Sequence, residues 1–199
     1  MSAPLQTPLP GFADPVFDSQ SVFRTVLNAL ARPGRIAAVP HSFEAPDGLA
    51  PSAAAACLCL LDQTTALWLA DGVGSEDIRS FLRFHTGCEM ADDPAAAHFA
   101  IVSSGDGHLN LDGFGIGEPE YPDRSTTVIV QVDGLRDGGG VRLTGPGIES
   151  VQNLAVDGLT PESWQAIARN NALFPLGADI LFAADGRIAG LPRSVKVGV

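Results

Sequence analysis

The chain has 199 residues, of which 45 % are hydrophobic and 18 % are charged, so it is long and apolar enough to form a globular domain with its own core. Its 23 acidic and 12 basic residues give a net charge of −11, which argues against the broad basic surface that nucleic-acid binding requires. The first basic residue is Arg24, and the longest apolar run, residues 53–61, is too short to span a bilayer. We therefore expect a cytoplasmic protein that has neither a membrane nor a nucleic acid as a partner.

The first 34 residues have the pattern of an extended arm followed by a helix. Residues 1–12 contain three prolines and no periodicity, so we expect an extended arm ahead of a single domain that spans residues 13–199. A helix is expected from a cap at Asp18 or Ser19 to about Arg32, where Pro33-Gly34 ends it. Its apolar residues at helical spacing are expected to form one buried stripe: Val22, Phe23, Val26, Leu27 and Leu30.

The remaining elements alternate between helices and strands. Three further helices are expected at residues 51–62, from a cap at Ser75 to Gly87, and from Thr160 to about residue 171. Strands are expected at residues 35–39, 66–70, 99–102, 127–132 and 141–144, and a hairpin at 179–184 and 187–191 turns at Asp185-Gly186. Residues 103–124 read as a long loop. This order predicts an α/β protein, a layered α/β/α domain with a mixed sheet.

Several catalytic signatures are missing from the sequence. No Gly-x-Gly-x-x-Gly motif opens a helix after a strand, and no glycine loop precedes the one lysine, Lys196. A Gly-x-Ser-x-Gly elbow and a His-Glu-x-x-His pair are also absent. We therefore do not expect a self-contained dinucleotide enzyme, a P-loop nucleotidase or a typical serine hydrolase.

The three cysteines are predicted to be reduced thiols of the core. Cys57 and Cys59 would point about 200° apart on a helix, so they cannot easily grip one metal ion. The spacing of His85 and Cys88 suits a metal better, but no second pair of ligands lies near it in the sequence. We expect no metal site.

Two patterns in the sequence are compatible with an anion-binding site. The segment from Thr144 through Gly145 and Gly147 follows a strand, and its glycines could free backbone N–H groups to cradle a phosphate-like anion. The alternative is a type II turn with Pro146 second and Gly147 third. Arg193 could bind a planar anion through its guanidinium fork.

His85 falls on the apolar stripe of its helix, near the C-terminal end. We expect a core histidine whose hydrogen bonds are satisfied by the protein. A role as a ligand or as a protonation switch is the alternative, because the helix dipole there favours a protonated ring.

Six segments in order along the chain carry a family resemblance. They are Asp18-Ser-Gln with Phe23-Arg24, Arg32-Pro-Gly34, Leu82-Arg-Phe-His-Thr86, Leu143-Thr-Gly-Pro-Gly-Ile148, Phe174-Pro-Leu-Gly177 with Asp179, and Leu191-Pro-Arg-Ser194. Together they resemble the PhnH family, the H subunit of carbon–phosphorus lyase in phosphonate breakdown. No single segment is specific, but the ordered set is.

The resemblance implies a fold like the large domain of type I pyridoxal-phosphate transferases, without the cofactor. In agreement, Lys196 stands three residues from the end of the sequence rather than on an internal loop, and a Schiff base needs an amine. Family members form homodimers and join the G, I and J subunits. With G, I and L, the assembly makes alpha-D-ribose 1-methylphosphonate 5-triphosphate from ATP and methylphosphonate, and no catalytic residue of the H subunit is implied.

Three hypotheses follow. The leading one is a non-catalytic subunit of this assembly. The second is an independent module that binds a phosphonate or a nucleotide such as ATP through Arg32, Thr144, Gly145, Gly147 and Arg193. The third, a free-standing pyridoxal-phosphate enzyme, is disfavoured by the position of Lys196.

Overall fold

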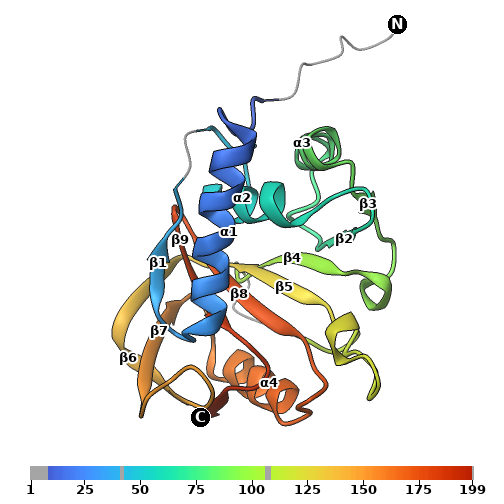
Figure 1. Ribbon diagram of the computed structural model, residues 1–199. Coiled ribbons are helices and arrows are strands. Elements are labelled where there is room, and N and C mark those ends of the chain that lie inside the picture. Colours follow the sequence, from blue (N-terminus) through green and yellow to red (C-terminus); the bar gives the residue numbers. More distant parts are fainter. Residues whose placement is uncertain (1–8, 41–42, 106–108, 199) are drawn as a thin grey trace, which may run out of the picture.

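The computed structural model describes residues 9–40, 43–105 and 109–198, and within them the chain forms two sheets and four α-helices (Figure 1). The helices are α1 (Pro15–Ala31), α2 (Pro51–Leu60), α3 (Glu76–Thr86) and α4 (Pro161–Asn171), with short 3-10 turns η1 (Pro94–Ala96) and η2 (Pro122–Arg124). The main sheet contains β1 (Ile36–Ala38), β2 (Ala66–Leu69), β3 (Glu89–Met90), β4 (Phe99–Ser103), β5 (Thr127–Gln131), β8 (Asp179–Ala184) and β9 (Arg187–Leu191). The second sheet contains β6 (Gly134–Thr144), β7 (Gln152–Asp157) and β10 (Lys196–Gly198).

The main sheet is mixed, as the sequence predicts. Its strand order is β1-β9-β8-β5-β4-β2-β3, and the strands from β8 to β3 are parallel. The predicted hairpin at Asp185 makes β9 antiparallel to β8, and β1 is antiparallel to β9. The second sheet is antiparallel, in the order β10-β6-β7.

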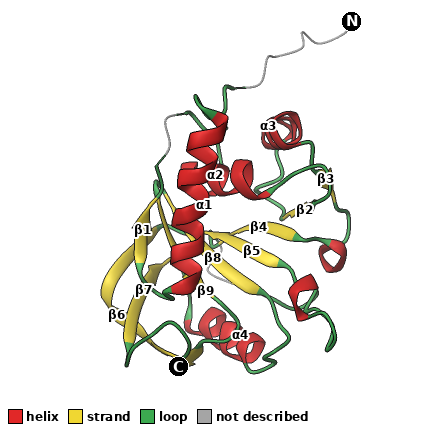
Figure 2. Ribbon diagram, in the orientation of Figure 1, coloured by secondary structure: helices red, strands yellow, loops and turns green. Residues whose placement is uncertain are grey.

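Both faces of the main sheet are covered, so the central strands are apolar on both sides. Ile101, Ile129 and Leu181 belong to the core under α1, α2 and α3. Their neighbours in the same strands, such as Val128 and Phe182, belong to a second core with α4 and the second sheet. Figure 2 shows the helices on both sides of the sheet, which confirms the layered α/β prediction.

Helix α1 differs from its prediction in its start and in its buried side. Its cap is Asp14, whose carboxylate accepts the N–H groups of Val16 and Phe17 at 3.2 Å, so a start at Asp18 or Ser19 is wrong. The sequence signal is Pro15, because proline suits the first helical position. The buried residues are Val22, Val26 and Ala29, Leu30 is half-buried, and the predicted stripe members Phe23 and Leu27 are exposed.

Most other boundaries agree within two residues, and the exceptions are strands β3, β6, β7 and β10. Strand β6 begins at Gly134 rather than at residue 141, because it continues through the Gly138–Gly140 run by a register shift. Strands β3, β7 and β10 are not predicted. Strands β3 and β10 have two and three residues, too few to show a period, and in β7 the alternation is limited to Leu154 and Val156. The cap of α3 at Ser75 and that of α4 at Thr160 are confirmed.

Candidate functional site

The Gly145–Ile148 segment forms a tight turn against the end of α1. The N–H of Ile148 donates to the carbonyl oxygen of Gly145 at 3.2 Å, and Gly147 has a φ of 81°, the geometry of a type II turn. A Cβ at Gly147 would collide with the carbonyl oxygen of Ala31, and one at Gly145 would lie 3.1 Å from that of Ser194. The glycines therefore let three backbone segments pack closely.

The structure brings most of the predicted anion-site residues to one end of the molecule. Arg32 is exposed at the end of α1, beside the turn. Thr144 is half-buried and pairs with Lys196 in the ladder between β6 and β10. Anion binding by Arg32, Thr144, Gly145 and Gly147 stays a prediction.

The guanidinium of Arg193 is engaged elsewhere. It forms an ion pair with Asp179 at 3.0 Å and donates to the carbonyl oxygens of Gly177 at 3.1 Å and Pro122 at 2.8 Å, and to the hydroxyl of Ser125. Only 14 % of its side chain is exposed. The fork that could bind a planar anion is therefore occupied by the protein's own acceptors.

His85 is half-buried and holds the described part of the N-terminal segment. Its Nε2 lies 2.8 Å from the carbonyl oxygen of Leu9, and since a carbonyl oxygen can only accept, the ring donates its Nε2–H there. The ring packs between Phe81 and Phe84, with centroids 4.7 and 5.0 Å away. A Cβ on Gly11 would lie 3.0 Å from the ring, so residues 9–11 pack closely on α3. The Nε2 atom has a partner within the protein, which is compatible with the expected satisfied histidine, and the alternative of a ligand or switch stays a prediction.

The cysteines are free thiols in or near the core under α1, α2 and α3. Burial raises the pKa of Cys57 and Cys88, and it raises the pKa of Cys59 to about 11. Cys59 also donates to the carbonyl oxygen of Ser19 on α1 at 3.3 Å. In the described part of the chain no group of three or more histidine, cysteine or acidic residues is placed to hold a metal ion.

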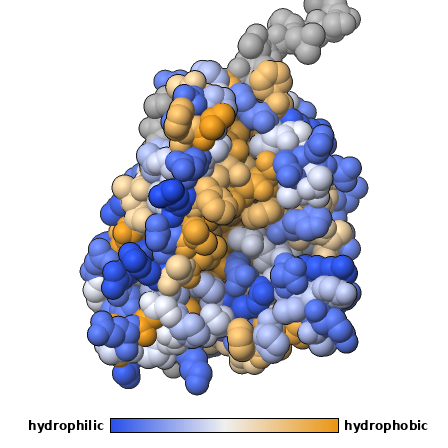
Figure 3. All heavy atoms as spheres, viewed as in Figure 1, coloured by the Kyte–Doolittle hydropathy of each residue, from blue (hydrophilic) through white to orange (hydrophobic). Residues whose placement is uncertain are grey.

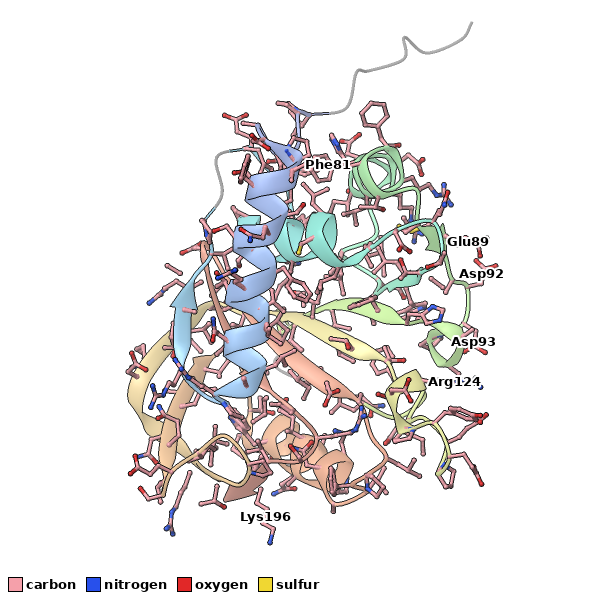
Figure 4. All side chains as sticks on the ribbon, in the orientation of Figure 1. Phe81, Glu89, Asp92, Asp93, Arg124 and Lys196 are labelled. Atoms are coloured by element: carbon pink, nitrogen blue, oxygen red, sulfur yellow. The ribbon has the colours of Figure 1, made fainter. Side chains whose placement is uncertain are left out.

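Lys196 projects from the lower edge of the molecule (Figure 4). It lies on the short strand β10 and is exposed. An exposed edge-strand amine does not fit a Schiff base, which forms in an enclosed site where a lowered amine pKa activates the lysine. The prediction that no pyridoxal phosphate binds remains to be tested.

An exposed apolar surface on α1 is the feature that the sequence reasoning missed. Val16, Phe23 and Leu27 are 74, 49 and 55 % exposed. Their spacing of seven and four residues places them within about 40° on one helix face. Hydrophobic colour continues from α1 toward α3 in Figure 3, and Phe84 of α3 is also 66 % exposed. We call the line of Val16, Phe23 and Leu27 on α1 the outer apolar surface.

The sequence held a signal for this surface. Val22, Val26 and Ala29 already form a complete buried stripe at helical spacing. Val16, Phe23 and Leu27 form a second line beside it, so α1 carries more apolar residues than one stripe needs. Large exposed apolar surfaces mark protein contacts in soluble proteins.

No helix among the described residues is long and apolar enough to cross a bilayer. The molecule is a layered α/β domain with an exposed apolar face on α1, a feature of proteins that contact other proteins.

Comparison with known proteins defines the family. Residues 10–198 match the family model described as bacterial phosphonate metabolism protein (PhnH), and the chain belongs to this family. It is 36 % identical over 197 residues to the alpha-D-ribose 1-methylphosphonate 5-triphosphate synthase subunit PhnH of Rhizobium meliloti strain 1021, covering 99 % of this chain and 98 % of the relative. It is 32 % identical over 184 residues to the "Putative C-P lyase subunit protein HtxG" of Stutzerimonas stutzeri, covering 90 % of this chain and 86 % of the relative. The family resemblance drawn from the six segments is confirmed.

Proposed function

We propose that this chain is a non-catalytic subunit of the carbon–phosphorus lyase machinery for the breakdown of organic phosphonates. In this role it supports formation of alpha-D-ribose 1-methylphosphonate 5-triphosphate from ATP and methylphosphonate. Its partners are the G, I and J subunits, and it works in the cytoplasm. The near-complete coverage of a relative named as a subunit of the corresponding synthase supports the proposal.

The observation that carries a docking role is the outer apolar surface. Phe23 and Leu27 are large apolar side chains that remain about half exposed on a helix whose other side is fully packed. Burying apolar surface stabilises a complex by roughly 25 cal/mol per Å² before the costs of association. We propose that this face contacts a partner subunit in the assembly.

Co-expression with the G, I and J subunits tests this role. A tag on this chain is expected to recover the three subunits in stoichiometric amounts. Phe23→Glu and Leu27→Glu are expected to reduce recovery at least ten-fold, because each places a charge in an apolar contact. Leu173→Glu is the matched control, since Leu173 is 48 % exposed and lies just after α4, in a different part of the chain.

Two results would contradict the proposal. A wild-type chain that never enters the complex would remove the subunit role itself. Normal recovery with both α1 variants, each folded by circular dichroism, would keep the subunit role and move the docking surface elsewhere. We also propose the homodimer that the family resemblance implies, and size-exclusion chromatography with light scattering of the isolated chain tests it.

The second candidate function is an independent phosphonate- or nucleotide-binding module. The exposed position of Arg32 beside the Gly145–Ile148 turn favours it. Calorimetry with ATP and with methylphosphonate, on the wild type and on Arg32→Ala, is the test. Absence of heat at millimolar ligand would count against the module, and saturable heat lost in Arg32→Ala would support it.

We also propose that the fold is like the large domain of type I pyridoxal-phosphate transferases. The mixed seven-stranded sheet, with helices on both faces, is compatible with that likeness.

A further inference from the structure

A cavity of about 290 Å³ lies over strands β2 and β4, on the face of the main sheet that also carries α4. Its floor includes Trp68 of β2 and Val102 of β4, and residues of the 109–114 loop form its opposite side. Ligand cavities in proteins begin at about 300 Å³, so this one suits a small ligand of one or two fused rings. Neither the predicted anion residues nor the outer apolar surface belongs to it.

Two aromatic rings make a corner in this cavity. The centroids of Trp68 and Phe114 are 5.6 Å apart and their planes meet at 76°. Phe114 is buried, whereas Trp68 is only partly buried. A flat ligand ring that stacks on either of these two side chains would also contact the edge or face of the other. The face of an indole ring also attracts cations.

The polar groups of the cavity set the charge of the ligand. Ser103, Asn110 and Asp112 lie around it and are exposed. The amide oxygen of Asn110 accepts the backbone N–H of Asp112 at 2.9 Å, which orients the Asn110 side chain and leaves the second lone pair of its oxygen for a ligand. Every residue that the structure describes in the lining is neutral or acidic, so the described part of the lining offers no cation to a phosphate group.

We propose that this cavity binds a flat nitrogen heterocycle of nucleobase size, either uncharged or cationic. The aromatic corner stacks the ring, while Asp112 and Asn110 accept hydrogen bonds from its ring N–H or exocyclic amine. Stacking on an aromatic side chain and amide recognition of an amine are the usual means of base recognition in proteins. This binding is a property of the isolated chain and does not rest on the proposed subunit role.

Tryptophan fluorescence gives a direct readout. The sequence contains two tryptophans, and Trp164→Phe leaves Trp68 as the single reporter. Adenine is the probe, because it is uncharged and carries an exocyclic amine. We expect saturable quenching with a dissociation constant in the millimolar range or below. Adenine is a small ligand, and each non-hydrogen atom of a ligand contributes only a limited binding free energy. Adenosine monophosphate is expected to bind no more tightly, and inorganic phosphate is expected to cause no quenching.

Three variants in the Trp164→Phe background locate the site. Asp112→Ala and Asn110→Ala are each expected to weaken adenine binding about three- to ten-fold, as the loss of one hydrogen bond does. Glu149→Ala is the matched control, because Glu149 is an exposed carboxylate in the loop after β6, and it is expected to leave binding unchanged. Because Asn110, Asp112 and Glu149 are exposed, their substitutions are expected to leave the fold intact.

Three outcomes would overturn the proposal. The first is no saturable quenching up to about 10 mM adenine, a concentration at which even weak fragments bind. The second is binding that neither rim variant weakens. The third is adenosine monophosphate binding more than ten-fold more tightly than adenine, which would mean that phosphate recognition dominates.

Discussion

Arg193 joins three segments that are distant in the sequence. Its guanidinium bonds to the 122–125 turn, to Gly177 and to Asp179, and its backbone N–H donates to the Asp179 carboxylate at 2.9 Å. A buried fork with this many acceptors stabilises the fold through geometry that lysine cannot reproduce. Its role in the described structure is therefore to hold the loops at the start of β8.

We expect Arg193→Ala to lower the free energy of unfolding by about 3 kcal/mol, because it leaves partly buried acceptors and Asp179 without their partner. Arg193→Lys should recover less than half of that loss. The control is Arg136→Ala, which breaks the exposed pair with Asp157 and should leave the free energy of unfolding nearly unchanged, because water screens an exposed ion pair. Urea unfolding measures all three, and equal losses for Arg193→Ala and Arg136→Ala would contradict this account.

Thiol reactivity is also decided at the residue scale. Burial raises the pKa of Cys59 to about 11, so at pH 8 only roughly one molecule in a thousand carries the reactive thiolate there. We expect labelling of Cys59 by a disulfide reagent to be roughly two hundred times slower than that of a free cysteine.

The direction of the pH dependence follows from the raised pKa. Labelling should accelerate about ten-fold for each unit of pH from 8 to 10, where an ordinary thiol already levels off near pH 9. Stopped-flow absorbance on the native protein, with mass mapping of the labelled site, checks this. Fast labelling of Cys59 at pH 8 would contradict this account. It would show that the thiol is more exposed to water, and ionises more readily, than its contacts indicate.

At the scale of elements, the turn after β6 is the point where α1 meets the second sheet. Gly147 lies directly against the carbonyl oxygen of Ala31, and a Cβ on Gly34 would lie 2.7 Å from the side chain of Leu143. Glycine is required because the backbones approach closely and because Gly147 has a positive φ.

A pair of glycine variants separates these two reasons. Gly147→Ala should cost about 3 kcal/mol of unfolding free energy, since it adds a collision to the strain of a positive φ. Gly72→Ala should cost only about 1 kcal/mol, because Gly72 has a φ of 89° but no atom within 4 Å of the added Cβ. Thermal or urea unfolding compares them, and equal costs would show that the turn relaxes away from α1.

At the scale of the whole molecule, two properties compete to direct association. The net charge of −11 favours docking on a basic partner surface, as opposite potentials steer encounter. The outer apolar surface favours a contact that depends on burial instead.

Salt distinguishes the two. Screening shortens the reach of charges from about 10 Å at 0.1 M to about 3 Å at 1 M salt, while apolar burial persists. If the outer apolar surface is the main contact, affinity for the partner subunits should fall less than about three-fold over this range. Surface plasmon resonance of the co-purified subunits measures it, and a loss of a hundred-fold or more would assign docking to charge.

Local signals predicted most of the regular elements. The caps at Ser75 and Thr160, the turn at Asp185-Gly186 and the apolar run of β5 were all recognisable, because each depends on neighbouring residues. Strands β3 and β10 were not predicted, since two or three residues carry no period and become strands only beside a partner.

The candidate site was harder to predict than the fold. The sequence predicts Arg193 as an anion ligand because a guanidinium can bind a planar anion through two N–H groups. It could not show that the guanidinium already donates its hydrogen bonds to Asp179, Gly177 and Pro122. It assigned Phe23 and Leu27 to a buried stripe, because a one-dimensional period does not reveal which side of a helix meets the sheet.

By itself, the sequence determined the α/β class, the caps of α3 and α4, the turn at Asp185-Gly186, the free thiols and the family to which the chain belongs, because these depend on composition, short spacings and ordered motifs. Only the tertiary structure decided that α1 leaves one apolar line in solvent, that Arg193 is a structural tie, and that Trp68 and Phe114 form a corner. The physical reason is distance along the chain. These three features arise from contacts between segments tens of residues apart, and such contacts exist only once the sheet has set its strand order.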